Sequence, residues 1–289
     1  MSDTFFTASP HWTWLIILYF FVGGIAGSAF FVAALLQWFG RADDQPVIRT
    51  GYAIGFWGAV ISGALLTLDL GRPLRFWHMV FQSDNLPHLL FKSWSPISFG
   101  VWGLMLFGAC AFLSWYSEKG GTLAKLIAAA GGLLGFFVAG YTGVLLSVTN
   151  RPIWADTPWL GALFLASGAS TGAAALMLLA RRRGATERSL RWLASFDTQA
   201  LIVELVILII FLASLWPIRQ VWISFWGFLL LVGGLAGILW PLRLHFTNPG
   251  TGFRNPAVMV LVGGFLMRAV VLLASNSIAV HHVASGGGG

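Results

Sequence analysis

The sequence predicts an all-α, polytopic membrane protein with eight transmembrane helices. Of the 289 residues, 57% are hydrophobic and only 9% are charged, whereas soluble domains carry about 25% charged residues. Apolar stretches of about 20 residues, the length that crosses a bilayer, recur along the whole chain. The 15 Trp and 24 Phe residues fit aromatic anchoring at the two membrane surfaces.

The predicted spans follow one another through polar loops, and no stretch is typical of a soluble domain. Trp12 and Trp14 open the first span, and the second stops at an Asp-Leu-Gly-Arg-Pro sequence that begins at Asp69. The loop after it, Gly71–Trp94, is the longest, and loops of about two dozen residues inside compact folds are often functional. In chain order the spans are Trp12–Phe39, Gly51–Leu70, Ile97–Tyr116, Leu123–Val148, Trp159–Ala180, Ala200–Trp216, Val221–Leu242 and Ala257–Ala279.

The distribution of Lys and Arg residues orients these spans. Basic residues favour the cytoplasmic side, and the loops after odd-numbered spans hold eleven of them against five after even-numbered spans. Both termini and the Gly71–Trp94 loop are therefore expected outside, and the net charge of +7 reflects topology rather than nucleic-acid binding. The eleven are Arg41, Arg49, Lys119, Lys125, Arg181, Arg182, Arg183, Arg188, Arg191, Arg243 and Arg254; the five are Arg72, Arg75, Lys92, Arg151 and Arg219.

A weak internal repeat divides the chain into two halves of four spans. Because each half starts on the same side of the membrane, the halves would be related in parallel. Asp69 and Arg72 fall opposite Ala213 and Trp216, so only the first half would keep these polar groups. A shift of about 144 residues places Gly24 on Gly168, Gly40 on Gly184, Pro73 on Pro217 and Arg75 on Arg219. Glycines spaced four apart, at Gly23/Gly27, Gly131/Gly135, Gly168/Gly172 and Gly233/Gly237, predict close helix packing.

Neither haem nor a metal ion is expected in this protein. A membrane-embedded b-type haem needs axial ligands, usually His, inside the spans. The single cysteine, Cys110, cannot form an internal disulfide or an iron–sulfur site. The six histidines all lie outside the middle of the predicted spans, at His11, His78, His88, His245, His281 and His282.

Four polar residues are expected at one level near the outer face. Tyr19 lies about one turn below Trp14, Asp69 and Arg72 end the second span, and Tyr141 lies about two turns from the outer end of the fourth. A carboxylate, a guanidinium and two phenols at one depth suit a quinone head group, since quinol oxidation releases protons that a carboxylate can accept. Asp69 is the predicted catalytic acceptor.

His11 and His78 lie close to this level along the chain and are predicted to border the same quinone site. Each of these features also has a structural interpretation. The phenols and imidazoles could be interfacial anchors, and Asp69 with Arg72 could form a salt bridge that caps the turn at the helix end.

Two further charged residues lie deeper, at Glu204 in the sixth span and Arg268 in the eighth. Neither is tolerable facing lipid. They could pair as a structural bridge, or they could belong to a proton path that faces the cytoplasm. The distance between them decides, and the sequence leaves both interpretations open.

At these residues the chain resembles the membrane subunits of the polysulfide reductase/NrfD family, over nearly its whole length. The Asp-Leu-Gly-Arg-Pro sequence in this setting is the specific element, whereas the glycine-rich pieces alone are not. The resembling stretches are Tyr19–Gly27 (YFFVGGIAG), Asp69–His78 (DLGRPLRFWH), Ser95–Trp102 (SPISFGVW), Tyr141–Leu146 (YTGVLL) with Arg151–Trp154 (RPIW), and Gly263–Arg268 (GGFLMR).

The resemblance implies two four-helix bundles, over residues 1–155 and 156–289, with a quinone site near the outer face of the first. It implies menaquinone or ubiquinone as the cofactor, and a prokaryotic cytoplasmic membrane as the location. The implied partners are a ferredoxin-like iron–sulfur subunit and usually a molybdopterin-type catalytic subunit. By family analogy the quinone-site residues are Tyr19, Asp69 and Tyr141, with Arg72 and His78 nearby. Some family members carry histidine where Tyr19 stands, which shifts the proton-acceptor role toward Asp69.

The sequence therefore predicts a quinone-binding membrane subunit that exchanges electrons with an iron–sulfur partner, with no activity when isolated. The Gly71–Trp94 loop, rich in arginine and aromatic residues, is the predicted docking surface for that partner. Two other classes of protein stay open at this point. A secondary transporter would suit the parallel repeat with Glu204 and Arg268, and a purely structural anchor would use Asp69 only at its helix end.

Overall fold

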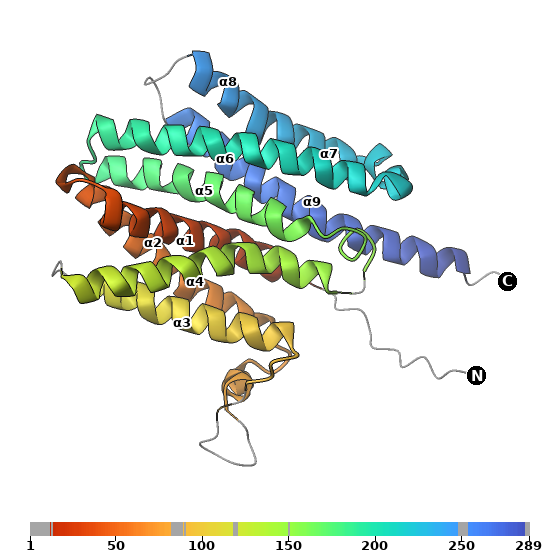
Figure 1. Cartoon of the computed structure of the whole chain (residues 1–289). Coiled ribbons are helices and arrows are strands. Elements are labelled where there is room, and N and C mark those ends of the chain that lie inside the picture. Colours follow the sequence, from red (N-terminus) through yellow and green to blue (C-terminus); the bar gives the residue numbers. More distant parts are fainter. Residues whose placement is uncertain are drawn as a thin grey trace.

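The computed structural model describes residues 12, 14–81, 89, 91–117, 121–149, 151–247 and 254–286. Throughout these residues the protein is helical, with no strand beyond one isolated bridge between Phe81 and Leu89 (Figure 1). Within these described ranges, eight helical segments are long and apolar enough to cross a membrane. The prediction of an all-α protein with eight spans is confirmed.

Two of the spans combine more than one helical segment. The second joins the short 3-10 segment η1 to α2, and in the seventh α7 continues through the π-helical segment η4 into α8. The elements are α1 (Trp14–Phe39), η1 (Ala42–Asp44), α2 (Gln45–Asp69), η2 (Pro73–Met79), α3 (Pro96–Tyr116), α4 (Thr122–Ser147), α5 (Leu160–Arg182), α6 (Glu187–Ser214), η3 (Trp216–Ile223), α7 (Phe225–Gly234), η4 (Leu235–Leu239), α8 (Trp240–Thr247) and α9 (Arg254–Gly286).

The sixth helix starts much earlier than its apolar stretch. Hydropathy predicts a start at Ala200, whereas α6 begins at Glu187, after the cap residue Thr186. The Thr186 side chain accepts a hydrogen bond from the Ser189 backbone N–H at 3.3 Å, which satisfies one of the free donors at the helix start. Capping, rather than hydrophobicity, therefore sets this boundary, and Glu204 lies about five turns into α6 rather than the predicted two.

The helices α1 and α5 form the interior of the molecule. Helix α1 packs against α2, α4 and α5, and α5 packs against α4, α6 and α9. Figure 1 shows the helices roughly parallel, with α7 and α8 at one edge, α3 at the other, and α1 and α5 between them. The division into bundles over 1–155 and 156–289 stays a prediction, and α1 and α5 are the helices through which the two halves meet.

Glycines allow neighbouring helices to approach closely, both at the centre of the molecule and at its edge. A Cβ atom built on Gly27 of α1 would overlap the backbone of Gly135 in α4, and one on Gly237 would overlap Gly263 in α9. Such contact between backbones requires residues without side chains. The glycine pattern of the sequence therefore marks helix packing, as predicted.

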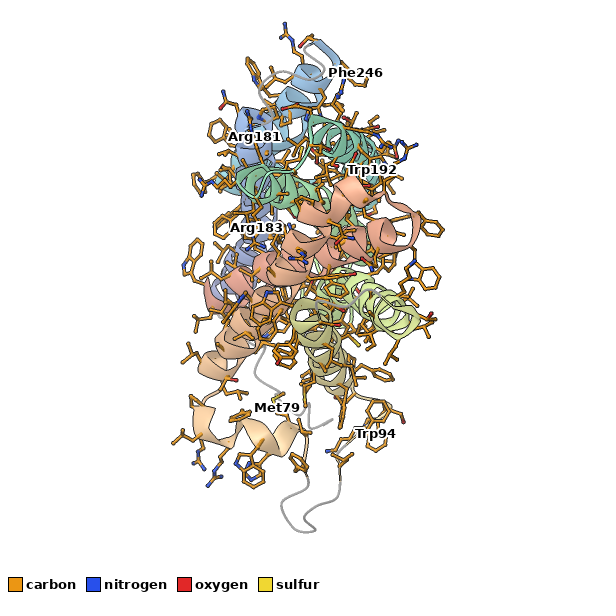
Figure 2. The ribbon with its side chains drawn as sticks, turned by 90° about the vertical axis from the view of Figure 1, so that its left-hand side faces the viewer. Met79, Trp94, Arg181, Arg183, Trp192 and Phe246 are labelled. Atoms are coloured by element: carbon orange, nitrogen blue, oxygen red, sulfur yellow. The ribbon has the colours of Figure 1, made fainter. Side chains whose placement is uncertain are left out.

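All the loops rich in arginine lie at one end of the helices. Figure 2 looks onto this end, where Arg181 and Arg183 close α5. Arg49 lies in the early turns of α2, at the same end. The η2 segment belongs to the opposite end and projects away from the bundle (Figure 1).

Gly27→Ala should destabilise the folded protein, because the new methyl group meets the Gly135 carbonyl oxygen, which cannot move without shifting α4. We expect a loss of about 1–3 kcal/mol, the usual cost of overpacking, seen as a lower thermal midpoint in detergent. Gly63→Ala is the matched control: it lies in α2 with nothing within 4 Å of the added atom. An equal midpoint for both variants would contradict the close α1–α4 contact.

Candidate functional site

The structure brings Tyr19 of α1 and Tyr141 of α4 together inside the first half. Both side chains are buried, with 3% and 8% of their surface exposed. Their phenol groups are close enough to interact electrostatically. Tyr19 lies in the second turn of α1 and Tyr141 in the last two turns of α4, so both belong to the end opposite the arginine-rich loops.

Tyr141 is fixed by the start of α3. Its hydroxyl donates a hydrogen bond to the Pro96 carbonyl oxygen. Its ring packs directly on Gly100, where a Cβ atom would overlap the ring. The ring of Phe137, one turn earlier on α4, lies 5.3 Å away between centroids. The first turns of α3 and the last turns of α4 therefore hold this phenol in one position.

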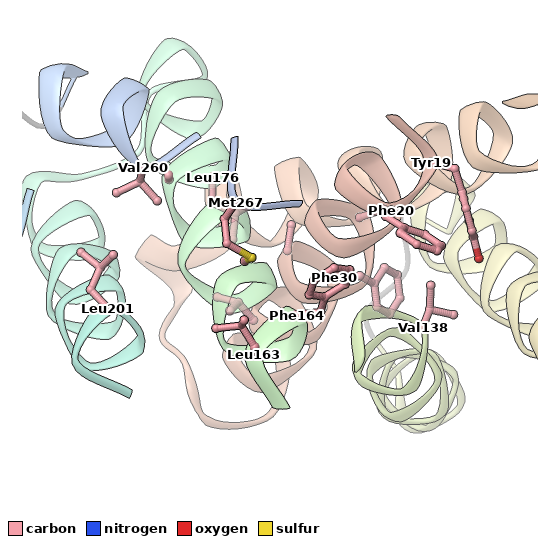
Figure 3. Packing of buried hydrophobic residues seen from close by; sticks show 14 of the residues in the cluster. Tyr19, Phe20, Phe30, Val138, Leu163, Phe164, Leu176, Leu201, Val260 and Met267 are labelled. Carbon is pink, nitrogen blue, oxygen red and sulfur yellow. The ribbon is translucent and has the colours of Figure 1, made fainter. Parts of the chain in front are cut away.

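Tyr19 and Ser62 have hydroxyl groups without hydrogen-bond partners among the described residues, and both side chains lie next to Gly23. The Tyr19 hydroxyl, at the free end of the ring in Figure 3, makes no hydrogen bond with any described residue. Ser62 of α2 is fully buried, and its Oγ also lacks a partner among the described residues. Both side chains border Gly23, since a Cβ atom there would lie 3.5 Å from Ser62 Oγ and 3.6 Å from Tyr19 Cε2.

The sequence interpretation missed Ser62, although the signal was present. Ser62 precedes Asp69 by seven residues, which places both on one face of a helix. Asp69 is the last residue of α2 and is half-buried. It therefore lies about 10 Å beyond Ser62 along the helix axis, at the rise of 1.5 Å per residue.

Arg72 and His78 flank Asp69 in the segment that follows. Arg72 is exposed and precedes η2, and His78 is partly exposed within η2. The His78 ring stacks on Trp77 with centroids 3.7 Å apart, and its Nδ1 lies 3.1 Å from the Arg75 carbonyl oxygen. The predicted residue His11 lies outside the described residues.

A second polar cluster lies deep between α5, α6 and α9. Arg268 is fully buried and donates hydrogen bonds to Ser167 Oγ at 3.0 Å, to the Gly264 carbonyl at 3.0 Å and to the Phe164 carbonyl at 3.2 Å. Glu204 accepts a hydrogen bond from Ser170 Oγ at 2.8 Å.

Within the described residues, Glu204 and Arg268 form no direct ion pair. Ser167 connects them, because it bonds Arg268 and interacts with the Glu204 carboxylate. Ser167 and Ser170 of α5 therefore connect the two charged side chains. Glu204, Ser170, Ser167 and Arg268 together form a polar ladder across the interior.

Asp197 extends this ladder, and the sequence interpretation missed it because the span was taken to begin at Ala200. Asp197 is fully buried on α6, seven residues before Glu204 and on the same face. Its Oδ2 lies 3.8 Å from His245 Nε2, while neither carboxylate oxygen has a hydrogen-bond partner among the described residues. His245 Nδ1 lies 2.9 Å from Thr198 Oγ1. The helical period from Glu204 back to Asp197 was the available signal.

The connection between α4 and α5 joins the two halves. Trp154 is fully buried, stacks on Trp12 with centroids 5.1 Å apart, and donates a hydrogen bond to the Val271 carbonyl of α9 at 2.9 Å. The preceding residue, Ile153, has a φ of 71°, which is a strained conformation for a β-branched residue. Arg151 packs 5.3 Å from the Trp154 ring, and burial lowers the pKa of its guanidinium.

Among the residues that the structure covers, no group of three or more His, Cys, Asp or Glu side chains could hold a metal ion. The polar side chains of the two clusters carry hydroxyl, carboxylate and guanidinium groups, which can hydrogen-bond organic oxygens.

The comparison with known families decides the assignment. The model of the family described as "Polysulphide reductase, NrfD" matches residues 3–279. This chain belongs to the NrfD (polysulphide reductase) family. The resemblance drawn from the sequence motifs is confirmed.

Bacterial relatives of this NrfD-family protein match along nearly their full length. Protein NrfD of Escherichia coli is 28% identical, over 95% of the present sequence and 98% of its own. The NrfD homolog of Haemophilus influenzae is 27% identical, over 94% and 96%. One of the polysulfide reductase chains of Wolinella succinogenes is 24% identical, over 92% and 94%. NrfD membership is consistent with a multi-pass membrane subunit of a redox complex.

Proposed function

We propose that this protein is the quinone-reactive membrane subunit of a respiratory oxidoreductase complex in the cytoplasmic membrane. It exchanges electrons between menaquinone or ubiquinone and an iron–sulfur partner subunit, and has no activity alone. The observation that carries the proposal is the meeting of two buried phenols, Tyr19 and Tyr141, beside the unpartnered Ser62 hydroxyl. Buried polar groups without partners are rare and need an explanation, and a quinone oxygen supplies the missing partner.

Each residue has a role that follows from its position. Tyr19 and Ser62 donate hydrogen bonds that orient the head group, and Tyr141 forms the wall against α3. Asp69, half-buried at the end of α2, accepts a proton and passes it to water. The bound quinol supplies the redox chemistry: two electrons leave for the partner's cluster and two protons are released. Arg72 is exposed in the segment that follows Asp69 and contributes a positive charge at this end of the helices.

The partner docks on the segment that projects beyond Asp69. Leu74, Phe76 and Trp94 are exposed by 91%, 53% and 78% in this region. Large exposed apolar side chains grouped together mark interaction sites. Electron transfer needs a short path, so a ferredoxin-like iron–sulfur subunit would lie over the quinone end, with a molybdopterin-type subunit beyond it. The Wolinella succinogenes relative is named as one of several chains of a polysulfide reductase, which supports a multi-subunit assembly.

A second candidate function is proton conduction through the interior. The observation that favours it is Asp197, fully buried with both oxygens unpartnered among the described residues, at the start of the ladder through Glu204 to Arg268. Arg268 Nη2 would lie 3.0 Å from a Cβ atom on Gly24, one and a half turns from Tyr19 on α1. The ladder therefore leads from the arginine-rich end toward the quinone site, and the outer face is reached through Asp69.

Asp69→Asn should lower quinol-linked turnover about 10²-fold or more, because it keeps the shape and removes the proton acceptor. Turnover is measured with the purified complex and a soluble quinol analogue. Asp43→Asn is the control, since Asp43 is an exposed carboxylate at the opposite end, in η1. If the Asp69 variant turned over normally in an intact complex, the Asp69 carboxylate would have a structural role and not a catalytic one.

Leu74→Ser combined with Phe76→Ser should release the iron–sulfur partner during purification, because the exposed apolar contact is lost. Retained iron–sulfur absorbance, measured per mole of the membrane subunit, reports the outcome. Leu123→Ser, equally exposed at the start of α4 on the opposite end, is the control. A full complement of clusters in the double variant would place the docking surface elsewhere, and a wild-type preparation without any clusters would favour a transporter.

Glu204→Gln should preserve assembly, because the amide oxygen still accepts the Ser170 hydrogen bond. Proton uptake from the arginine-rich side, measured per electron in proteoliposomes, should fall to about a tenth or less, since the titratable group on that path is gone. Glu187→Gln, exposed in the first turn of the same helix, should leave the ratio unchanged. An unaltered ratio in Glu204→Gln would make the Glu204–Arg268 ladder a structural bridge.

A further inference from the structure

A polar cavity of about 510 Å³ lies at the arginine-rich end, away from Tyr19 and Asp69. This volume falls within the usual range of about 300–1,000 Å³ for small-molecule sites. The cavity lies between the ends of α1, α3 and α5 and the starts of α2 and α4. Its lining residues are Gln37, Gln45, Ile48, Arg49, Tyr52, Ser114, Trp115, Ser117, Ala124 and Arg183.

The charge of the cavity is positive and uncompensated within its lining. Arg49 of α2 and Arg183 at the end of α5 both line it, and no lining residue is Asp or Glu. The nearby carboxylate of Asp44 is already engaged, since it accepts hydrogen bonds from the Arg41 N–H at 2.8 Å and from Ser189 Oγ at 2.6 Å. Two like charges that face one cavity repel each other, and an anion between them removes the repulsion.

The inner wall of the cavity holds two buried hydroxyl groups without partners. Tyr52 and Ser114 are each 7% exposed, and neither hydroxyl oxygen has a hydrogen-bond partner in the described parts of the protein. Buried hydroxyls are normally hydrogen-bonded. Two donors beneath two guanidinium groups form a site for an oxyanion, because Arg pairs with phosphate through several N–H groups at once.

The surroundings of the mouth favour a phosphate that belongs to a lipid. Trp115 lines the cavity and stacks on Phe56 of α2 with centroids 5.0 Å apart. Aromatic side chains of this kind mark the headgroup level of a membrane. Directly beyond lies Trp57, 6.0 Å from Trp115 and 53% exposed, followed on the same face by Val60 and Ile61 at 45% and 47%. This apolar strip offers a surface for a lipid tail next to the charged mouth.

We propose that this cavity binds the phosphate group of an anionic phospholipid, with Arg49 and Arg183 on the phosphate, the Tyr52 and Ser114 hydroxyls beneath it, and a lipid tail along α2 past Trp57. Basic pockets between transmembrane helices bind such headgroups. The site lies at the opposite end of the helices from Asp69, so its occupancy stabilises the protein without entering the quinone reaction.

Lipid binding to the purified full-length protein tests the proposal. Native mass spectrometry and the thermal midpoint are recorded with phosphatidylglycerol, with zwitterionic phosphatidylcholine, and with inorganic phosphate. We expect phosphatidylglycerol to bind about tenfold or more tightly than phosphatidylcholine, as is typical for added charge-assisted contacts. Arg49→Gln combined with Arg183→Gln should abolish this preference, whereas Arg181→Gln with Arg188→Gln, exposed at the same end but outside the cavity, should keep it.

Tyr52→Phe is a second variant that should fold normally, because it removes a hydroxyl that has no hydrogen-bond partner in the described parts of the protein. It should bind phosphatidylglycerol several-fold more weakly, with the lipid-free midpoint unchanged or raised. If the double arginine variant kept its preference for phosphatidylglycerol over phosphatidylcholine, the cavity would not be the lipid-binding site. Stabilisation by inorganic phosphate, with no preference for phosphatidylglycerol, would overturn the lipid assignment and leave a free anion as the ligand.

Discussion

The contact of α1 with α4 and α5 at glycine positions is the constraint on which the rest of this protein depends. Gly27 meets Gly135, and Gly172 of α5 meets the backbone of Ser28 and Ala29. Helices in a bilayer gain little from hydrophobic burial and associate through close packing and hydrogen bonds. Because these helices touch along their backbones, an interior exists that excludes lipid, and every buried polar group described above lies in it or at its ends.

That interior explains how a membrane protein tolerates so many polar side chains. Arg268 is compatible with membrane depth because two backbone carbonyls and Ser167 accept hydrogen bonds from its Nη1 and Nη2, although its Nε has no partner among the described residues. The exceptions are informative: Ser62, Asp197, Tyr52 and Ser114 are buried with unsatisfied polar atoms among the described residues. They lie at three separate places, namely the proposed quinone site, the proposed proton ladder and the polar cavity lined by Arg49 and Arg183. These four groups coincide with the proposed sites of ligand or proton binding, whereas the unsatisfied atoms of Trp222 and Ser275 belong to none of them.

Much of the fold could be predicted because it rests on composition. The length of the apolar runs gave the eight spans, and the glycine spacing gave the packing seams. Helix starts set by caps could not be predicted this way, since Thr186 satisfies one backbone donor and leaves no hydropathy signal. Because the sixth span was predicted to begin at Ala200, Asp197 was not recognised as a buried residue. Tyr19, Asp69 and Tyr141 were recognised from motifs, whereas Ser62 was missed because a lone serine in a span is common. The cavity lined by Arg49 and Arg183 forms where the ends of five helices meet in space, and the order of residues along the chain does not show which ends meet.

The quinone is proposed to bind between Tyr19 and Tyr141, below Asp69. Photoaffinity labelling of the native complex in membranes with an azido-quinone, followed by peptide mapping, locates the bound head group. We expect the label to attach to residues of α1 near Tyr19, of α2 between Ser62 and Asp69, or of α4 near Tyr141, and excess unmodified quinone to prevent the labelling. Labelling confined to the arginine-rich end, around Tyr52 and Ser114, would rule out a quinone site between the two phenols.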